Sequence, residues 1–210
     1  MKSFKFSILI AAVALSTFAL PGTASAASPF KKIRGGTVHV PSGVIFPPRV
    51  GACQFVTTKV YGSAGRDAGA GYDAGSTIRG DVYVYPLGTY AKDFNAELRI
   101  QQNAIKASNK NVKLISQSGF QVNQGGRNIS GSLVQYELTR SLFGEKSHHC
   151  GSQLYLFRDG AWLIQGRFSY PIGRGATATK QIADFLRLWQ WRAQGNMVQL
   201  IRTVRDGSDS

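Results

Sequence analysis

Residues 159–189 read DGAWLIQGRFSYPIGRGATATKQIADFLRLW, and two periodicities follow each other in this stretch. Apolar and polar residues alternate over 162–170, which predicts a β-strand with one buried face. After Pro171, apolar residues recur at helical spacing over about 177–191, which predicts an amphipathic helix. The expected buried faces hold Trp162, Ile164, Phe168 and Tyr170 on the strand and Ile182, Phe185, Leu186 and Trp189 on the helix. A strand that leads directly into such a helix indicates a helix packed on a sheet.

The rest of the chain adds strands that are joined by short turns. Runs rich in β-branched and aromatic residues lie at 53–61, 82–85, 112–122, 129–139 and 153–157, with a short middle strand near 71–73. Glycine-containing turns such as Gly125-Gly126 and Asp159-Gly160 separate the later runs, as hairpins require. Short hairpin connections predict antiparallel neighbours in the sheet.

Another helix is expected over 89–108, because Phe94, Leu98 and Ile105 recur along one stripe. Together these elements predict an α+β fold, with a mainly antiparallel sheet of about six to seven strands and two helices packed on one face. Packing on one face is expected because the second face of the strand at 162–170 is largely polar.

The order of the elements resembles the Mog1/PsbP-like fold over roughly residues 50–192. The closest local similarity is the ending quoted above, where FSYP at 168–171 leads into the closing helix. The stretch DVYVYPLG at 81–88 resembles a short strand of small exported bacterial proteins of unknown function. These motifs are structural, so the resemblance transfers no active-site residue. It implies an accessory or binding protein, on fold analogy alone.

The N-terminal residues have the layout of a secretory signal peptide. Lys2 and Lys5 precede an uncharged, mostly apolar run at 8–20, and Ala24-Ser25-Ala26 forms an A-x-A cleavage signature. The run is shorter than the roughly 20 residues that span a bilayer. We therefore expect residues 1–26 to be removed and the mature protein, which has no further membrane-spanning segment, to be periplasmic or secreted. No cysteine follows the cleavage site, so a lipid anchor is not expected.

Composition divides the remaining chain into three parts. Residues 27–50 contain four prolines and three glycines, which predicts a flexible leader. Residues 51–194 are expected to form a single α+β domain. Residues 195–210 are expected to be a partly disordered C-terminal extension.

The only cysteines of the chain are Cys53 and Cys150. An even pair in an oxidising compartment is expected to form a disulfide. One alternative is a metal site in which His148 and Cys150, on the same face of one strand, are completed by Cys53 or His39. The other is a catalytic pair of Cys150 with His149. No CxxC, HxxxH or HExxH pattern is present, so no metal site is predicted.

The chain is strongly basic, since 25 Lys and Arg against 11 Asp and Glu give a formal net charge of +14. Such a balance favours an anionic partner. The candidate anion-binding residues are Arg187, Arg192, Arg202 and Arg205, and a second basic group consists of Lys31, Lys32 and Arg34.

Signatures of catalysis and of cofactor binding are missing from the sequence. No G-x-S-x-G or H-E-x-x-H pattern occurs, and the glycine-rich run at 62–80 lacks the spacing of a nucleotide loop, so no cofactor is predicted. Export and the lack of a nucleic-acid-binding motif argue against a nucleic acid partner. The sequence therefore predicts an exported, non-catalytic binding or accessory protein that recognises an anionic envelope component or an envelope protein. The alternative is an exported hydrolase.

Overall fold

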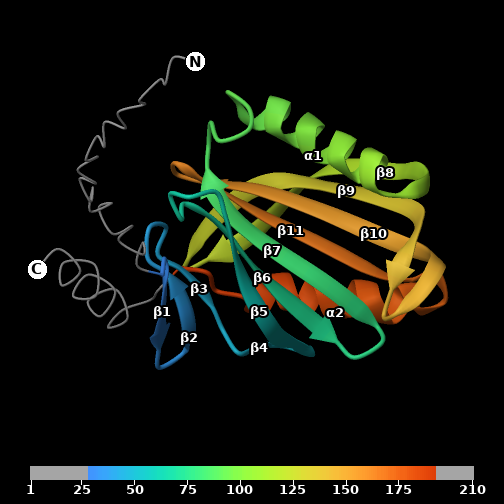
Figure 1. Cartoon of the computed structure of the whole chain (residues 1–210), viewed down its shortest axis with the longest axis horizontal. Coiled ribbons are helices and arrows are strands. Elements are labelled where there is room, and N and C mark those ends of the chain that lie inside the picture. The colour runs from blue at the N-terminus through green and yellow to red at the C-terminus, as the bar shows by residue number, and fades with distance from the viewer. Residues whose placement is uncertain (1–27, 193–210) are drawn as a thin grey trace, which may run out of the picture.

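The computed structural model describes residues 28–192, in which eight strands form one curled antiparallel sheet and three strands form a small sheet beside it (Figure 1). The order in the large sheet is β4-β5-β6-β7-β11-β10-β9-β8. Its strands are β4 (Arg49–Val50), β5 (Cys53–Tyr61), β6 (Asp67–Ala74), β7 (Ile78–Pro86), β8 (Lys110–Gln124), β9 (Arg127–Leu142), β10 (Glu145–Asp159) and β11 (Trp162–Pro171). The remaining elements are β1 (Phe30–Ile33), β2 (Gly36–His39), β3 (Val44–Phe46), α1 (Phe94–Ser108), the 3-10 turn η1 (Ile172–Arg174) and α2 (Gly175–Leu188).

The expected sheet of six to seven strands is wrong, because the large sheet has eight. The difference comes from the very short β4 and from β6, whose sequence DAGAGYDA has a low strand propensity. Strand β6 nevertheless pairs with β5 on one side and with β7 on the other over nearly its whole length. Backbone hydrogen bonds to two flanking strands therefore hold a strand that side-chain propensity alone underestimates.

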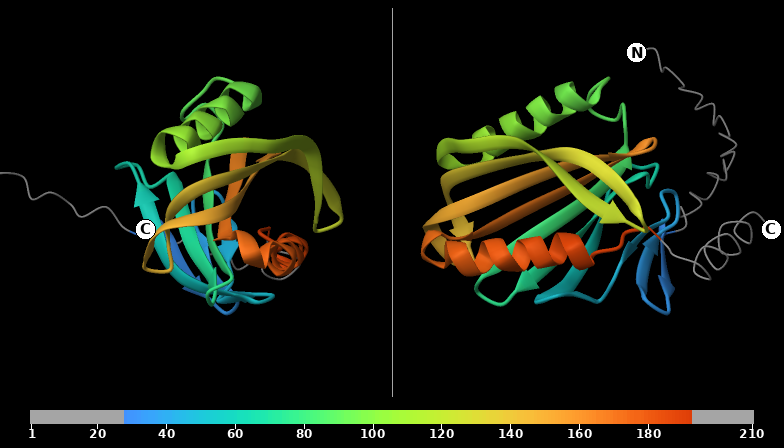
Figure 2. Two further views of the ribbon diagram at one scale, coloured as in Figure 1. Left: turned by 90° about the vertical axis from the view of Figure 1, so that its right-hand side faces the viewer. Right: turned by 180° about the vertical axis from the view of Figure 1, so that it is seen from behind.

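The two helices lie on opposite faces of the sheet, so the prediction that both pack on one face is also wrong. Figure 2 shows α2 inside the curl of the sheet and α1 outside it. Strand β10 shows why both faces need cover. Leu154 and Leu156 belong to the core cluster that includes Leu98 and Ile105 of α1, whereas Tyr155 and Phe157 belong to the cluster under α2. Because successive side chains of a strand point to opposite faces, this run of apolar residues needs a helix on each side.

The expected helix at 89–108 is present but begins at Phe94. Asp93 caps it, because its side chain accepts a hydrogen bond from the backbone N–H of Ala96 at 2.8 Å. Leu98 and Ile105 are buried as expected. The longest helix in the described part has 15 residues, and neither helix there is long and apolar enough to cross a membrane.

The expected flexible leader is instead an ordered three-stranded antiparallel sheet, β1-β2-β3, followed by β4. Val44 and Phe46 are buried in the core under α2. The backbone of Ile45 joins this segment to the end of the domain, since its carbonyl accepts from Trp189 Nε1 at 2.9 Å. The prolines and glycines indicated a loose segment, but the apolar run around Ile45 packs against two C-terminal tryptophans that are distant in the sequence.

The expected disulfide between Cys53 and Cys150 is not formed, because both are free, buried cysteines. Cys53 begins β5 and lies in the core under α2, whereas Cys150 lies on β10 in the cluster under α1. Three strands separate β5 from β10 in the sheet, so the two residues are about 19 Å apart along it at ~4.8 Å per strand. Disulfide bonds need Cα atoms within about 7 Å of each other.

The predicted signal peptide at 1–26, the extension at 195–210, and Arg202 and Arg205 within it lie outside the residues that the structure describes.

Candidate functional site

The two described arginines of the predicted anion site make ion pairs within the protein. Arg192 donates to Asp159 Oδ2 through Nε at 2.6 Å and to the Ser42 carbonyl through Nη1 at 2.8 Å. Arg187, on the exposed side of α2, pairs with Asp184 at 3.0 Å. Both arginines therefore already have a carboxylate partner, and Arg192 holds the segment after α2 against the sheet.

The histidines also have partners within the fold. His148 pairs with Glu145, and His149 Nε2 lies 3.8 Å from Glu137. Buried His39 bonds to Ser42 Oγ and to the Gly65 carbonyl, each at 2.8 Å, and burial lowers its pKa. Across residues 28–192, no group of three or more His, Cys, Asp or Glu side chains is arranged to hold a metal ion.

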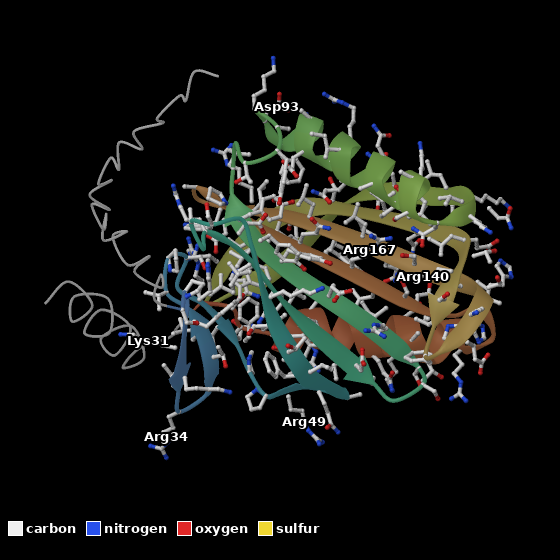
Figure 3. All side chains as sticks on the ribbon, viewed as in Figure 1. Lys31, Arg34, Arg49, Asp93, Arg140 and Arg167 are labelled. Atoms are coloured by element: carbon white, nitrogen blue, oxygen red, sulfur yellow. The ribbon has the colours of Figure 1, made fainter. Side chains whose placement is uncertain are left out.

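Two other arginines, Arg140 of β9 and Arg167 of β11, come together at a cleft beside the C-terminal end of α1. Figure 3 shows both on the side of the sheet that α1 covers, whereas Lys31 and Arg34 lie at the far end of the molecule. The cleft has a volume of about 740 Å³. Its lining residues are Ala107, Ser108, Asn109, Lys110, Thr139, Arg140, Ser141, Lys146, Ser147 and Arg167. Four of these are basic and none is acidic. We call it the arginine cleft.

Within residues 28–192, neither Arg140 nor Arg167 forms an ion pair with a carboxylate. Arg140 donates to Ser169 Oγ at 2.9 Å, and the buried Nε of Arg167 has no hydrogen-bond partner in the described part of the chain. Burial lowers the pKa of Arg167, and the charge of Arg140 lowers it further. Tyr83, Asp81 and Tyr136 act in the opposite direction and raise it. Two guanidinium groups that repel each other in a partly buried place favour an anion between them.

The C-terminal end of α1 borders the arginine cleft, and a helix C-terminus by itself repels anions. Here the last carbonyls already have donors. Ser108 Oγ donates to the Ala104 carbonyl and Asn109 Nδ2 to the Ile105 carbonyl, each at 2.7 Å. These bonds offset the partial negative charge of the helix end. The exposed Lys110, which follows directly, adds a positive charge at the same rim.

A second cavity, of about 310 Å³, meets the arginine cleft at Arg167 and extends under α1. Its lining residues are Tyr61, Asp67, Tyr83, Tyr85, Tyr90, Ile100, Gln101, Ala104, Gln165 and Arg167. We call it the tyrosine pocket. Tyr90 donates a hydrogen bond to Asp67 Oδ2 across it. Burial, together with the neighbouring Glu97 charge, raises the pKa of Asp67 although the bond from Tyr90 opposes this shift.

Glu97 lies behind this pocket and is completely buried. Its Oε1 accepts from Tyr85 Oη at 3.1 Å and from Gln101 Nε2 at 2.8 Å. Its Oε2 is buried and has no donor within the described residues. Tyr85 Oη also lies 3.0 Å from Gln165 Oε1, so the pocket floor is a connected network of polar groups. An unpartnered buried oxygen is uncommon in native proteins and points to a role for the carboxylate beyond packing.

Gly69 on β6 leaves room for the rings of Tyr61 and Tyr83, which line the pocket. The rings of Tyr61 and Tyr83 lie 5.8 Å apart on the strands that flank it. A Cβ atom at Gly69 would come within 2.9 Å of the Val82 carbonyl oxygen and 3.1 Å of the Tyr83 ring. A larger residue here would therefore displace a pocket tyrosine.

Sequence reasoning missed both Arg140 and Arg167, because each is a single basic residue within a strand and neither belongs to a basic run. A usable signal was present. The alternation over 162–170 places Arg167 on the same face as Leu163, and Leu163 is completely buried. A charged residue on the same strand face as a core residue is expected to point towards the protein interior.

Comparison with known families and with curated proteins finds no match. Among solved structures, the chain is similar to the crystal structure of a Pseudomonas aeruginosa protein of unknown function, described as a putative regulator. The two chains are 9% identical with a TM-score of 0.40, over 75% of this chain and 94% of that one. A likeness of this size carries no functional inference, and the resemblance to the Mog1/PsbP-like fold stays a prediction.

Proposed function

We propose that this chain is an exported, non-catalytic binding protein that holds a small anionic ligand in the arginine cleft. The carrying observation is the pair formed by Arg140 and Arg167, which make no ion pair with a carboxylate among residues 28–192. The signal-peptide pattern of residues 1–26 supports delivery to the periplasm or outside. An anionic envelope component is the ligand class that fits both features.

The cost of keeping Arg167 in this place supports a functional role. Its Nε is buried and has no acceptor among residues 28–192, and burial together with the charge of Arg140 lowers its pKa. Asp81, the register partner of Arg167 on β7, partly offsets the positive charge without an ion pair. A phosphate or carboxylate would supply the acceptor that Nε lacks and a further negative charge. Charge-assisted hydrogen bonds from arginine to such groups are among the strongest in proteins.

Calorimetric titration of the purified protein with inorganic phosphate, in low-salt buffer free of other multivalent anions, tests the proposal. We expect saturable binding that weakens as salt is raised. Arg167→Gln and Arg140→Gln should each lower the affinity about tenfold or more, since hydrogen bonds to charged groups are worth about 1.5–3 kcal/mol.

Arg99→Gln is the matched control, because Arg99 is exposed on α1 and lines neither cavity. It should leave the affinity unchanged. Loss of binding in Arg99→Gln equal to that in Arg167→Gln would show a diffuse charge effect and would contradict the proposed site. If the same titration detects no binding of phosphate, and a parallel one detects none of the carboxylate acetate, the proposed function is contradicted.

A further inference from the structure

We infer that the ligand is a zwitterion whose ammonium group enters the tyrosine pocket while its phosphate or carboxylate group is held by Arg140 and Arg167. This inference rests on the proposed function and adds the second half of the ligand. It depends on the acidic and aromatic lining of the tyrosine pocket and on the unpartnered Glu97 Oε2 buried behind it, which the arginine cleft does not explain.

The charges of the tyrosine pocket are the reverse of those in the arginine cleft. Asp67 lines the pocket and is only 8% exposed, and the fully buried Glu97 lies directly behind Tyr85 and Gln101. The lining contains no lysine, and its one arginine, Arg167, stands where the pocket meets the cleft. The Glu97 charge opposes ionisation of Asp67, and a cation placed between them would relieve this repulsion, so this end of the cavity suits a cation.

The aromatic lining suits an ammonium group in particular. Tyr61 and Tyr83 form one ring pair at 5.8 Å, and Tyr85 and Tyr90 form a second at 5.4 Å. Burial raises the pKa of all four hydroxyls, with contributions from nearby acidic groups, so all four rings stay neutral at physiological pH. Neutral tyrosine rings attract cations through their electron-rich faces, and cages of such rings bind quaternary ammonium groups.

A neutral polyhydroxylated ligand would fit these residues less well. It could bond to Gln101, Gln165 and the tyrosine hydroxyls, but it would leave Asp67 and Glu97 without a counter-charge. An ammonium group supplies that charge and is attracted by the rings as well. The sugar alcohol inositol therefore serves as a neutral probe that should not bind.

The spacing along β11 limits the length of the ligand. Gln165 lines the tyrosine pocket and Arg167 is two residues further on the same face, about 7 Å away along the strand. An ammonium beside Gln165 and an anion at Arg167 must therefore be joined by a linker of a few bonds. Phosphocholine and phosphoethanolamine have this chemistry, either as free molecules or as the headgroups of phospholipids.

Titrating the full mature chain with phosphocholine, tetramethylammonium, inorganic phosphate and inositol tests the inference. Phosphocholine should bind at least tenfold more tightly than inorganic phosphate, tetramethylammonium should bind weakly, and inositol should not bind. Glu97→Gln and Asp67→Asn should each weaken phosphocholine binding at least fivefold while changing the phosphate affinity less than twofold. Arg167→Gln should weaken both ligands.

The control carboxylate is Asp184, a half-buried residue of α2 on the other face of the sheet (Figure 2) that pairs with Arg187. Asp184→Asn should change neither affinity. Thermal melts show whether each variant folds. If Glu97→Gln does not fold, the affinities of Asp67→Asn decide the test. Equal affinity for phosphocholine and phosphate in the wild type would overturn the inference and leave the proposed function standing. Binding of neither would overturn both.

Vesicles of phosphatidylcholine separate the two sources of the headgroup. Co-sedimentation that free phosphocholine competes away would support the inference with a lipid headgroup as the ligand. Tight binding of free phosphocholine without co-sedimentation would support it with a soluble ligand. Co-sedimentation that phosphocholine does not compete away, and that Asp67→Asn does not weaken, would count against the pocket.

Discussion

Arg192 Nε lies 2.6 Å from Asp159 Oδ2, so the last described residue is tied to the turn between β10 and β11. Trp191 Nε1 donates to the same oxygen at 3.0 Å. Burial alone would raise the pKa of Asp159, but the bonds from Arg192 and Trp191 and the nearby arginine charges hold it below the ordinary value of 3.8. This contact holds the segment after α2 against the sheet and gives Arg192 a structural role.

Asp159→Asn should lower the free energy of unfolding at pH 7 by about 2–3 kcal/mol. This is below the ~3–5 kcal/mol for breaking a fully buried pair, because Arg192 is 28% exposed. A lowered pKa means that the stabilisation is fully present above pH 3.8 and is lost as the pH falls through the lower folded-state pKa. Denaturant melts from pH 3 to pH 7 should show the wild-type advantage shrinking only at the acidic end. An advantage that is constant with pH would contradict this assignment.

Two free thiols per chain should react with a thiol reagent after unfolding without reductant. In the native protein neither should react quickly, because both cysteines are completely buried and burial raises the pKa of Cys53 to about 11. The control is the same protein labelled after denaturation with reductant, which should also give two reactive thiols per chain. Fewer than two thiols before reduction would mean that the strand order separating Cys53 from Cys150 is wrong.

Phe185→Ala on α2 should cost about 3–5 kcal/mol of stability, since it empties a fully buried site between aromatic rings. Its ring centroid lies 5.1 Å from that of Tyr72 and 5.2 Å from that of Phe168. Leu188→Ala on the same helix should cost under about 1 kcal/mol, because Leu188 is exposed. Chemical denaturation of both variants measures the difference, and similar losses would place the wrong helix face against the sheet.

The helix at 175–188 was predictable because its buried stripe, including Ile182 and Phe185, is a local periodicity. The leader was not, because strands β1 to β3 depend on contacts such as Trp189 with Ile45, whose partners are 144 residues apart. The sequence periodicity also could not show that helices cover both faces of the sheet. Which face a helix covers depends on the order of the strands in the sheet. That order includes the pairing of β7 with β11, which are far apart in the sequence.

The candidate site was harder still to predict, because Arg140, Arg167, Asp67 and Glu97 come from four different elements. Each is a single residue with no motif around it. Their proximity follows from the strand order and from the position of α1, neither of which the spacing in the sequence encodes. The excess of positive charge led to the prediction of an anionic ligand, and the grouping of arginines in the sequence pointed to Arg187 and Arg192, which the structure places in ion pairs with Asp184 and Asp159.

Asp67→Asn should raise the melting temperature at pH 7, although the same change is expected to weaken binding of an ammonium group. Because burial raises the pKa of Asp67, ionising it costs stability, and that cost appears as the pH rises through 3.8 towards the higher folded-state pKa. The groups that face this carboxyl are Tyr61, Tyr85, Tyr90 and Glu97.

Thermal melts should therefore show little difference between Asp67→Asn and the wild type at pH 4, and a clear gain for the variant at pH 7. Asp184→Asn should show no such trend. If the variant is less stable than the wild type at pH 7, Asp67 stabilises the fold and its ionisation does not destabilise the protein, which contradicts this prediction.

The side-chain Nε–H signal of Arg167 in ¹⁵N-edited NMR spectra tests the central claim most directly. In the free protein no group of residues 28–192 accepts from this donor, so its signal is expected at a position typical of a weakly bonded guanidinium. Its absence in Arg167→Gln assigns it. Addition of inorganic phosphate should shift it downfield in a saturable way, together with the signal of Arg140 and without change at Arg99. Phosphate binding that leaves the Arg167 signal unmoved would contradict the account.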